Sequence, residues 1–187
     1  MNFSNKTTWE GNIKLGNTYN YYGEKLGEQF ICEASNLCVN KKYNVIISSN
    51  CLEHIANPIK AISNWLDHLI ENGVLFLVLP RKDSNFDWRR PDTTFEHILE
   101  DYKNNIDEDD LTHLDEIIKL HDFEKDCGLV NKSKKINIFK KNKKYRQIHH
   151  HIFNLELLSE IGKYFCCQEI LSGSVKKNNF IILRKLS

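Results

Sequence analysis

The stretch that most constrains the fold runs from residue 43 to residue 80, where two apolar runs flank a helical pattern. Tyr43–Ser49 is apolar and rich in β-branched residues, which is typical of a strand covered on both faces. Asn57 followed by Pro58 predicts a helix start, because asparagine caps helices well and proline fits their first turn. Val74–Leu79 is the most hydrophobic run and predicts a central strand. This order indicates a βαβ unit with a right-handed crossover.

Small polar residues follow the first of these strands. Ser48, Ser49 and Asn50 come first, and Glu53 with His54 then forms an acidic–imidazole turn. Ligands of parallel α/β sheets bind beyond the carboxyl ends of the strands, so we expect the chemistry between residues 48 and 54. An ordinary strand–turn–helix connection has the same pattern, and these residues alone leave both interpretations open.

Composition narrows the class of protein. A chain of 187 residues with 41% hydrophobic and 27% charged residues is predicted to form one soluble domain. Its net charge of +1 gives no overall field to attract nucleic acid or an anionic membrane. No apolar run is long enough to span a bilayer and Met1–Glu10 is polar, so we expect a cytoplasmic protein with no membrane partner. The six irregularly spaced cysteines are predicted to be free thiols.

The residues before and after the βαβ unit carry weaker patterns. Met1–Gln29 shows no sustained period and is predicted to be irregular, with one short strand near Thr18–Tyr22. Phe30–Ala34 is a short apolar run that predicts another strand. Farther along, Thr93-Thr-Phe-Glu96 has the capping-box pattern that starts a helix.

Charged stretches and a terminal hairpin complete the pattern. Asp107–Asp110 precedes a helical period, and we interpret these acids as favourable to the helix dipole rather than as a metal site. Lys132–Arg146 holds eight basic residues, for which a solvated mobile loop is favoured over RNA binding. Asn154 predicts the cap of a further helix, and Cys166–Leu171 with Phe180–Leu183 predicts a C-terminal hairpin.

Several of these motifs together resemble a known family. The run SSN-C-LEH-I-ANP, followed by a helix, NG and VLFLVLP, is similar to the middle of class I S-adenosylmethionine (SAM)-dependent methyltransferases of the small-molecule type. The segments FDWRRPDTTFEHILEDY, DLTHLDEIIKLHD and HHHIF resemble a subgroup, many of whose members look like enzymes encoded alongside cell-surface glycan assembly. The resemblance implies a single domain over residues 1–187 with a Rossmann-like α/β sheet. It also implies helices on both faces, a C-terminal antiparallel hairpin, and a loop and helical region on the substrate side at residues 81–153.

The chain departs from the family pattern at three points. The glycine-rich loop that cradles the methionine end of SAM has no counterpart, because the glycines of the first 29 residues are scattered. Asn50 stands where the subgroup has histidine, and the Gly-Gly turn before the next strand is reduced to Asn72-Gly73. We therefore expect a sheet shortened at its N-terminal half. Phe30–Ala34 then fills the vacated place beside Tyr43–Ser49, or a partner chain or second copy completes the sheet.

The resemblance also implies which residues contact SAM. Glu33 and Ala34 match the acid–small pair near the adenine. Ser48, Ser49 and Asn50 match the turn that flanks the methionine portion, where small side chains let the backbone approach the cofactor.

Methyl transfer to a hydroxyl usually needs a base, and histidine has a suitable pKa. We predict His54, His149 and His151 as the catalytic group, because alternate residues of an extended segment point to one side. For the substrate we predict five residues of the region after the second strand, with the two arginines clamping a phosphate or carboxylate: Asp87, Arg89, Arg90, His97 and His113.

The predicted function is SAM-dependent methylation of a small polar acceptor, such as a sugar or a phosphate-bearing intermediate of surface glycan assembly. One alternative is a degenerate, non-catalytic methyltransferase domain that acts through a partner chain. A second is a metal-dependent enzyme that uses histidines with Asp87, Glu116 and Asp122. Because His113 and His121 are eight residues apart and no His-Glu-x-x-His motif is present, we predict no metal site from the sequence.

Overall fold

The computed structural model describes residues 1–8, 11–21 and 23–186 and is built around one four-stranded sheet. The strands β5 (Tyr43–Ser49), β6 (Leu69–Pro80), β8 (Asn178–Arg184) and β7 (Gln168–Val175) lie side by side in that order. β5 and β6 are parallel, and β8 runs antiparallel to both β6 and β7. The predicted βαβ unit and C-terminal hairpin are confirmed.

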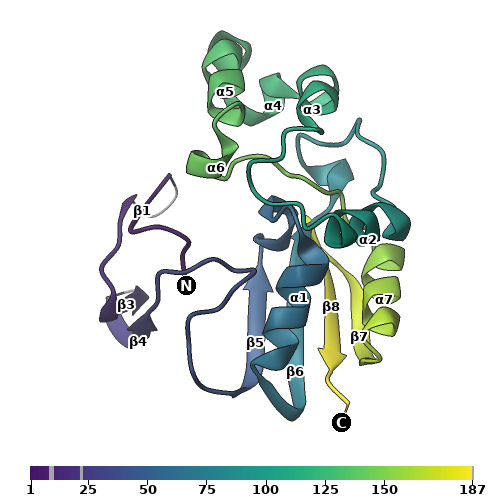
Figure 1. Ribbon diagram of the computed structural model, residues 1–187. Coiled ribbons are helices and arrows are strands. Elements are labelled where there is room, and N and C mark those ends of the chain that lie inside the picture. Colours follow the sequence, from purple (N-terminus) through teal and green to yellow (C-terminus); the bar gives the residue numbers. More distant parts are fainter. Residues whose placement is uncertain (9–10, 22, 187) are drawn as a thin grey trace.

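Two amphipathic helices cover one face of this sheet (Figure 1). In α1 (Pro58–Asp67) the side chain of Asn57 accepts a hydrogen bond from the backbone N–H of Lys60, as the cap prediction required. In α7 (Leu155–Tyr164) Asn154 caps the helix in the same way. The apolar sides of both helices meet the same set of strand residues in the main core: Leu75, Leu77, Leu79, Ile181 and Leu183.

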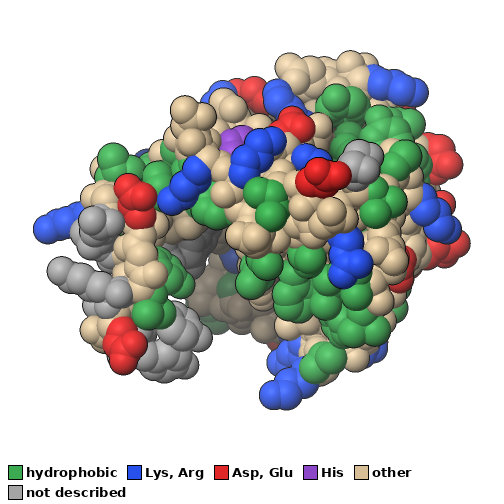
Figure 2. All heavy atoms as spheres, turned by 90° about the horizontal axis from the view of Figure 1, so that it is seen from below, with side chains coloured by type: hydrophobic (Ala, Val, Ile, Leu, Met, Phe, Trp, Pro, Cys, Tyr) green, Lys and Arg blue, Asp and Glu red, His purple; other side chains and the backbone are tan. Residues whose placement is uncertain are grey.

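The opposite face of the sheet carries no helix of the described residues, so the expectation of helices on both faces is wrong. Val45 and Ile47 of β5 are 51% and 65% exposed on this face. Leu171 of β7 is also exposed, whereas the rings of Phe76 and Phe180 pack edge to face and partly cover each other. Figure 2 shows a broad group of hydrophobic side chains along one side of the main body. Alternate residues of each strand therefore enter the core or face outward.

Short helices gather beyond the carboxyl ends of β5 and β6 (Figure 1). They are α2 (Phe95–Lys103), α3 (Leu114–Leu120), α4 (Phe123–Cys127), α5 (Lys132–Phe139), α6 (Asn142–Tyr145) and the 3-10 helices η1 (Leu52–His54), η2 (Lys82–Ser84) and η3 (Leu129–Asn131). Ile117, Phe123, Phe139 and Ile148 form their small core. The expected mobile loop at 132–146 is therefore a pair of helices, because Phe139 is buried in that core.

The N-terminal segment also differs from its prediction. It forms two small hairpins, β1 (Lys6–Thr7) with β2 (Gly11–Asn12) and β3 (Gly16–Tyr21) with β4 (Glu24–Gln29). The strand expected near 18–22 matches β3, although Tyr22 lies outside the described residues.

The expected strand at Phe30–Ala34 is absent, and only Ile31 makes an isolated bridge, to Asn2. Among the described residues β5 is thus an edge strand, and the place that we assigned to 30–34 is not filled by them.

Candidate active site

The turn after β5 positions the first candidate residues. Asn50 adopts a left-handed backbone conformation (φ 47°), which asparagine tolerates well, and its N–H donates to the carbonyl of Val78 on β6. The chain then turns back through η1, whose Glu53 is buried. Just before the turn, the hydroxyl of Ser48 is buried and has no hydrogen-bond partner within the part of the chain that the structure describes. The carboxyl end of β5 is thus polar, as expected.

His54 is held by the segment that carries the three consecutive histidines. Its Nδ1 must donate to the carbonyl of Ile148 (3.0 Å), because a carbonyl only accepts, and its Nε2 is left as an acceptor. Burial, reinforced by the nearby His149, lowers the pKa of His54 to about 3. The rings of His54 and His149 stand edge to face with centroids 4.6 Å apart. His54 is therefore neutral near pH 7.

His149 forms a dyad with Asp87, which comes from the loop after β6. The Nδ1 of His149 lies 2.6 Å from the carboxylate of Asp87, which is 1% exposed. Burial by itself raises the pKa of Asp87, but the nearby His121, the hydrogen bond from His149 and the charge of Arg90 lower it well below its usual range. Because Asp87 is ionised, it accepts a hydrogen bond from Nδ1 of His149. In the neutral ring Nε2 is then the acceptor, which is the orienting logic of a catalytic dyad.

Glu53 is the third member of a group with His54 and His149. One of its ligand atoms, one of His54 and one of His149 all lie within 4.8 Å of one another. Glu53 is 2% exposed, and its Oε2 has no hydrogen-bond partner in residues 1–8, 11–21 and 23–186. Burial raises the pKa of Glu53 to about 7, against the lowering effect of His149. The site thus holds the imidazoles of His54 and His149 and one carboxyl group, that of Glu53, which titrates near neutrality.

The two arginines do not form the expected clamp. Arg90 is 2% exposed and donates to the carboxylates of Asp87 and Glu116 and to the backbone carbonyls of His149 and His150. Its role is to hold the histidine segment against the loop after β6. Arg89 is partly exposed, stacks on the ring of Trp88 and lies 3.5 Å from Asp122.

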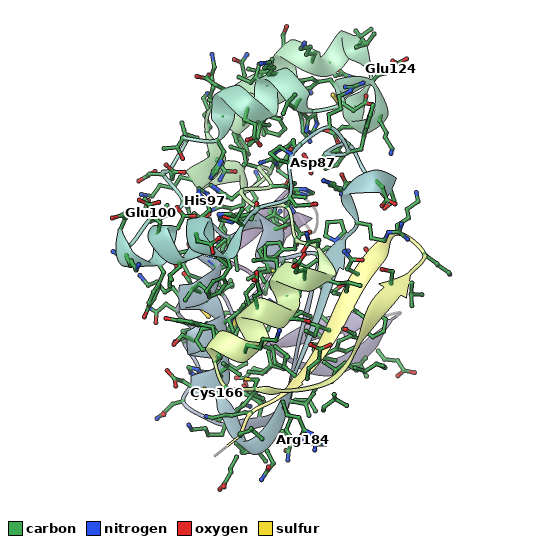
Figure 3. All side chains as sticks on the ribbon, turned by 90° about the vertical axis from the view of Figure 1, so that its right-hand side faces the viewer. Asp87, His97, Glu100, Glu124, Cys166 and Arg184 are labelled. Atoms are coloured by element: carbon green, nitrogen blue, oxygen red, sulfur yellow. The ribbon has the colours of Figure 1, made fainter. Side chains whose placement is uncertain are left out.

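The structure separates His149 from His151, which we had placed in one cleft. The Nε2 of His151 lies 2.8 Å from the carboxylate of Asp101 on α2, in a second group with His97 and His113. Both groups lie at one end of the sheet, since Figure 3 places Asp87 and His97 there, far from Cys166 and Arg184 at the opposite end. The alternation of an extended segment predicted that His149 and His151 point to the same side. Instead, Arg90 hydrogen-bonds the backbone between them, and each imidazole contacts a carboxylate from a different element.

Glu33 and Ala34 lie in a turn rather than at the end of a strand. The carboxylate of Glu33 accepts from Arg146 at 2.6 Å, and the carbonyl of Ala34 accepts from the indole of Trp65 at 2.7 Å. Arg146 also pairs with the buried carboxylate of Glu108 at 2.9 Å. Ser49 and Asn50 are exposed, as a backbone approach to a ligand requires.

Sequence reasoning assigned no role to two contributors to this site, Glu53 and His121, although Glu53 lies in the turn expected to carry the chemistry. Glu53 lies directly before His54 in the turn, and that position beside a predicted base was the available signal. His121 lies 3.8 Å from Asp87 and 3.0 Å from Asp126, and its neighbours in sequence gave no indication of either contact. Burial lowers the pKa of His121, but the hydrogen bond to Asp126 and the nearby carboxylate of Asp87 raise it overall.

The fold and the site define a class of protein: an open Rossmann-like α/β sheet with titratable groups gathered at the carboxyl ends of its parallel strands. A family model described as a methyltransferase domain matches residues 18–127, which is more than half of the chain. The chain belongs to this methyltransferase family, whose domain supports methyl transfer in general and whose members generally use SAM. No curated protein matches the chain significantly. No helix of the described residues is long and apolar enough to cross a membrane.

Proposed function

We propose that this chain methylates a small polar acceptor with SAM and that His149 accepts the acceptor's proton. The observation that carries the proposal is the buried Asp87–His149 pair at 2.6 Å, next to the carboxyl end of β5. Asp87 orients the ring so that the lone pair of Nε2 is free for a hydroxyl. The pKa of His54 is lowered, so its ring is neutral and packs beside His149. We therefore assign it a positioning role and not the role of the base that the sequence predicted.

The residues at the end of β5 fit the methionine portion of SAM. The buried hydroxyl of Ser48 has no hydrogen-bond partner among the described residues, and the neighbouring Ser49 and Asn50 are exposed. For the adenine end of SAM we still propose Glu33 and Ala34. The side chain of Glu33 is 44% exposed, so its carboxylate can be reached from solvent. When bound, SAM supplies an electrophilic methyl group. The chain's own contribution is to orient the acceptor and take up its proton.

The loop after β6 supports a sugar or phosphate-bearing acceptor. Trp88 is 47% exposed, and Asp122 fixes its ring by accepting from the indole N–H at 2.9 Å. Arg89 stacks on that ring with its guanidinium carbon 4.4 Å from the centroid. A cation next to an exposed aromatic ring suits a phosphorylated or carboxylated ring compound.

The experiment titrates the purified chain with SAM by calorimetry and then screens phosphorylated and free sugars for a mass gain of one methyl group. Wild type should bind SAM and methylate one class of acceptor. His149→Gln should keep SAM binding and lose about 100-fold or more in methyl transfer, because it removes the base but not the cofactor contacts. His68→Gln, far from the dyad, is the matched control. Absence of SAM binding by the folded wild type would overturn the proposal.

A second candidate, a non-catalytic domain that acts through a partner chain or a second copy, draws support from one observation. The outer edge of β5 bears no strand of the described residues, so its backbone groups are free to pair with another strand. Size-exclusion chromatography with light scattering separates the two candidates. A stable complex without SAM binding would favour this alternative, and a SAM-binding monomer would exclude it.

A further inference from the structure

We propose that His97, Asp101, His113 and His151 together bind one transition-metal cation of the Zn²⁺ class. We call these four residues the histidine–aspartate cluster. It is separate from the group formed by Glu53, His54 and His149, and the proposal does not depend on methyl transfer.

The distances within the cluster match a metal coordination sphere. A donor atom of each residue lies within 4.8 Å of one of every other. The Nε2 atoms of His97 and His113 are 3.1 Å apart, and the carboxylate of Asp101 lies 2.8 Å from His151 and 3.4 Å from His97. In a tetrahedral site with bonds of about 2.0–2.2 Å, neighbouring ligands are about 3.3 Å apart. The printed separations of 2.8, 3.1 and 3.4 Å lie on both sides of this ligand–ligand distance. Metal binding would therefore require only the other ligand pairs of the cluster to move closer together.

The fold brings these donors together from three segments that are distant in sequence. His97 and Asp101 are four residues apart on α2, so they lie on the same side of the helix one turn apart. His113 is the residue directly before α3, and His151 lies in the extended segment before α7. This i, i+4 pair with two distant ligands is invisible to a search for metal-binding motifs in the sequence.

The chemistry of the donors suits a borderline divalent cation. Three imidazoles and one carboxylate are a donor set that Zn²⁺ accepts. A neutral imidazole has one nitrogen with a free lone pair, so each ring of the cluster can supply one ligand atom. The charge of Arg90 acts on the rings of His113 and His151. Asp87 and Glu116 pair with Arg90 and reduce its repulsion of a cation.

A bound ion would connect α2, the start of α3 and the histidine segment. Side-chain hydrogen bonds such as the one between His97 and His113 already join these elements, and a shared ion would add further bonds between them. We therefore expect the metal to stabilise the region of short helices beyond the sheet.

The experiment uses the full chain, with any affinity tag removed, after dialysis against chelator. Zn²⁺ is titrated by calorimetry, Co²⁺ by visible absorption, and bound metal is counted by mass spectrometry. We expect one ion per chain, the intense visible bands of tetrahedral Co²⁺, and a higher melting temperature with Zn²⁺. Asp101→Asn and His113→Ala should each weaken binding by about 100-fold. Glu100→Gln, which changes an exposed acid beside Asp101 on α2, should bind like wild type.

His54→Gln identifies the competing site. If His54→Gln abolishes binding while His113→Ala and Asp101→Asn retain it, the ion belongs to the Glu53 group and the proposal is overturned. Equal binding by all variants, or no binding by the folded wild type, would overturn it as well. Circular dichroism of each variant separates loss of a ligand from loss of the fold.

Discussion

At the scale of residues, buried charge is the feature that most distinguishes this protein. Asp87, Arg90 and His121 are each at most 5% exposed and satisfy one another in the loop region beyond the sheet. Such groups are costly to bury and costly to separate, because removing one partner leaves another charge without compensation. The same network that fixes the proposed base therefore also holds this part of the fold.

Asp87→Asn should lower the free energy of unfolding by about 3 kcal/mol, because Arg90 and His121 lose their buried counter-charge. Urea denaturation followed by circular dichroism measures it. The control is Asp83→Asn, whose carboxylate is 60% exposed in its pair with Arg81 and which should change stability by less than about 0.5 kcal/mol. Similar effects of the two substitutions would contradict the network's role.

Glu53 should make stability fall as the pH rises. Its pKa is raised from 4.5 to about 7, so between these values the folded state holds a proton that the unfolded state has released. Ionising the buried Glu53 therefore costs folding stability. This cost is absent below about pH 4.5, grows between pH 4.5 and 7, and reaches about 3 kcal/mol above about pH 7. Glu53→Gln removes it, so the variant should match wild type at pH 4.5 and exceed it at pH 8. Parallel pH–stability curves would refute this.

At the scale of elements, caps decide where the helices begin. Thr94, one residue later than the capping-box prediction, accepts from His97 at the start of α2, and Asn154 accepts from Leu157 at 2.8 Å at the start of α7. Both helices are short, so each unsatisfied N–H in the first turn is a large part of their hydrogen bonding.

Asn154→Ala should cost about 1 kcal/mol of stability, because the backbone N–H of Leu157 loses its acceptor. Asn154→Ser keeps an acceptor oxygen at the cap and should recover most of this loss. Thermal or urea unfolding of the two variants checks the difference. If both lose the same amount, packing rather than capping holds this end of α7.

At the scale of the whole molecule, the sheet has one closed and one open side. Leu77 is fully buried between the sheet and its helices, whereas Ile47 on the neighbouring strand is 65% exposed on the other side. An edge strand with exposed apolar side chains is a site for self-association.

Ile47→Lys should change the free energy of unfolding by less than about 0.5 kcal/mol and reduce association at high protein concentration. Sedimentation velocity over a concentration series measures the association. Leu77→Lys is the matched substitution on the buried side and should abolish folding, because a charge would enter the core. Strong destabilisation by Ile47→Lys would show that the open side is covered in the folded protein.

Sequence alone predicted much of the sheet and part of the site. The βαβ unit, the caps at Asn57 and Asn154 and the terminal hairpin follow from local periodicity and capping, and the structure confirms them. The N-terminal hairpins were not predicted, because their residues carry no alternating apolar pattern to report a core face. The helices of 132–146 were missed because Phe139 gains its burial from distant residues.

What the sequence by itself determined is the family, the core strands and the end of the sheet where titratable residues gather, since all of these depend on neighbours along the chain. The tertiary structure decided the partners. It paired His149 with Asp87 and His151 with Asp101, engaged Arg90 internally and left one face of the sheet open. The physical reason is that a hydrogen bond or ion pair between residues about 60 positions apart depends on how elements pack, and no local period encodes that packing.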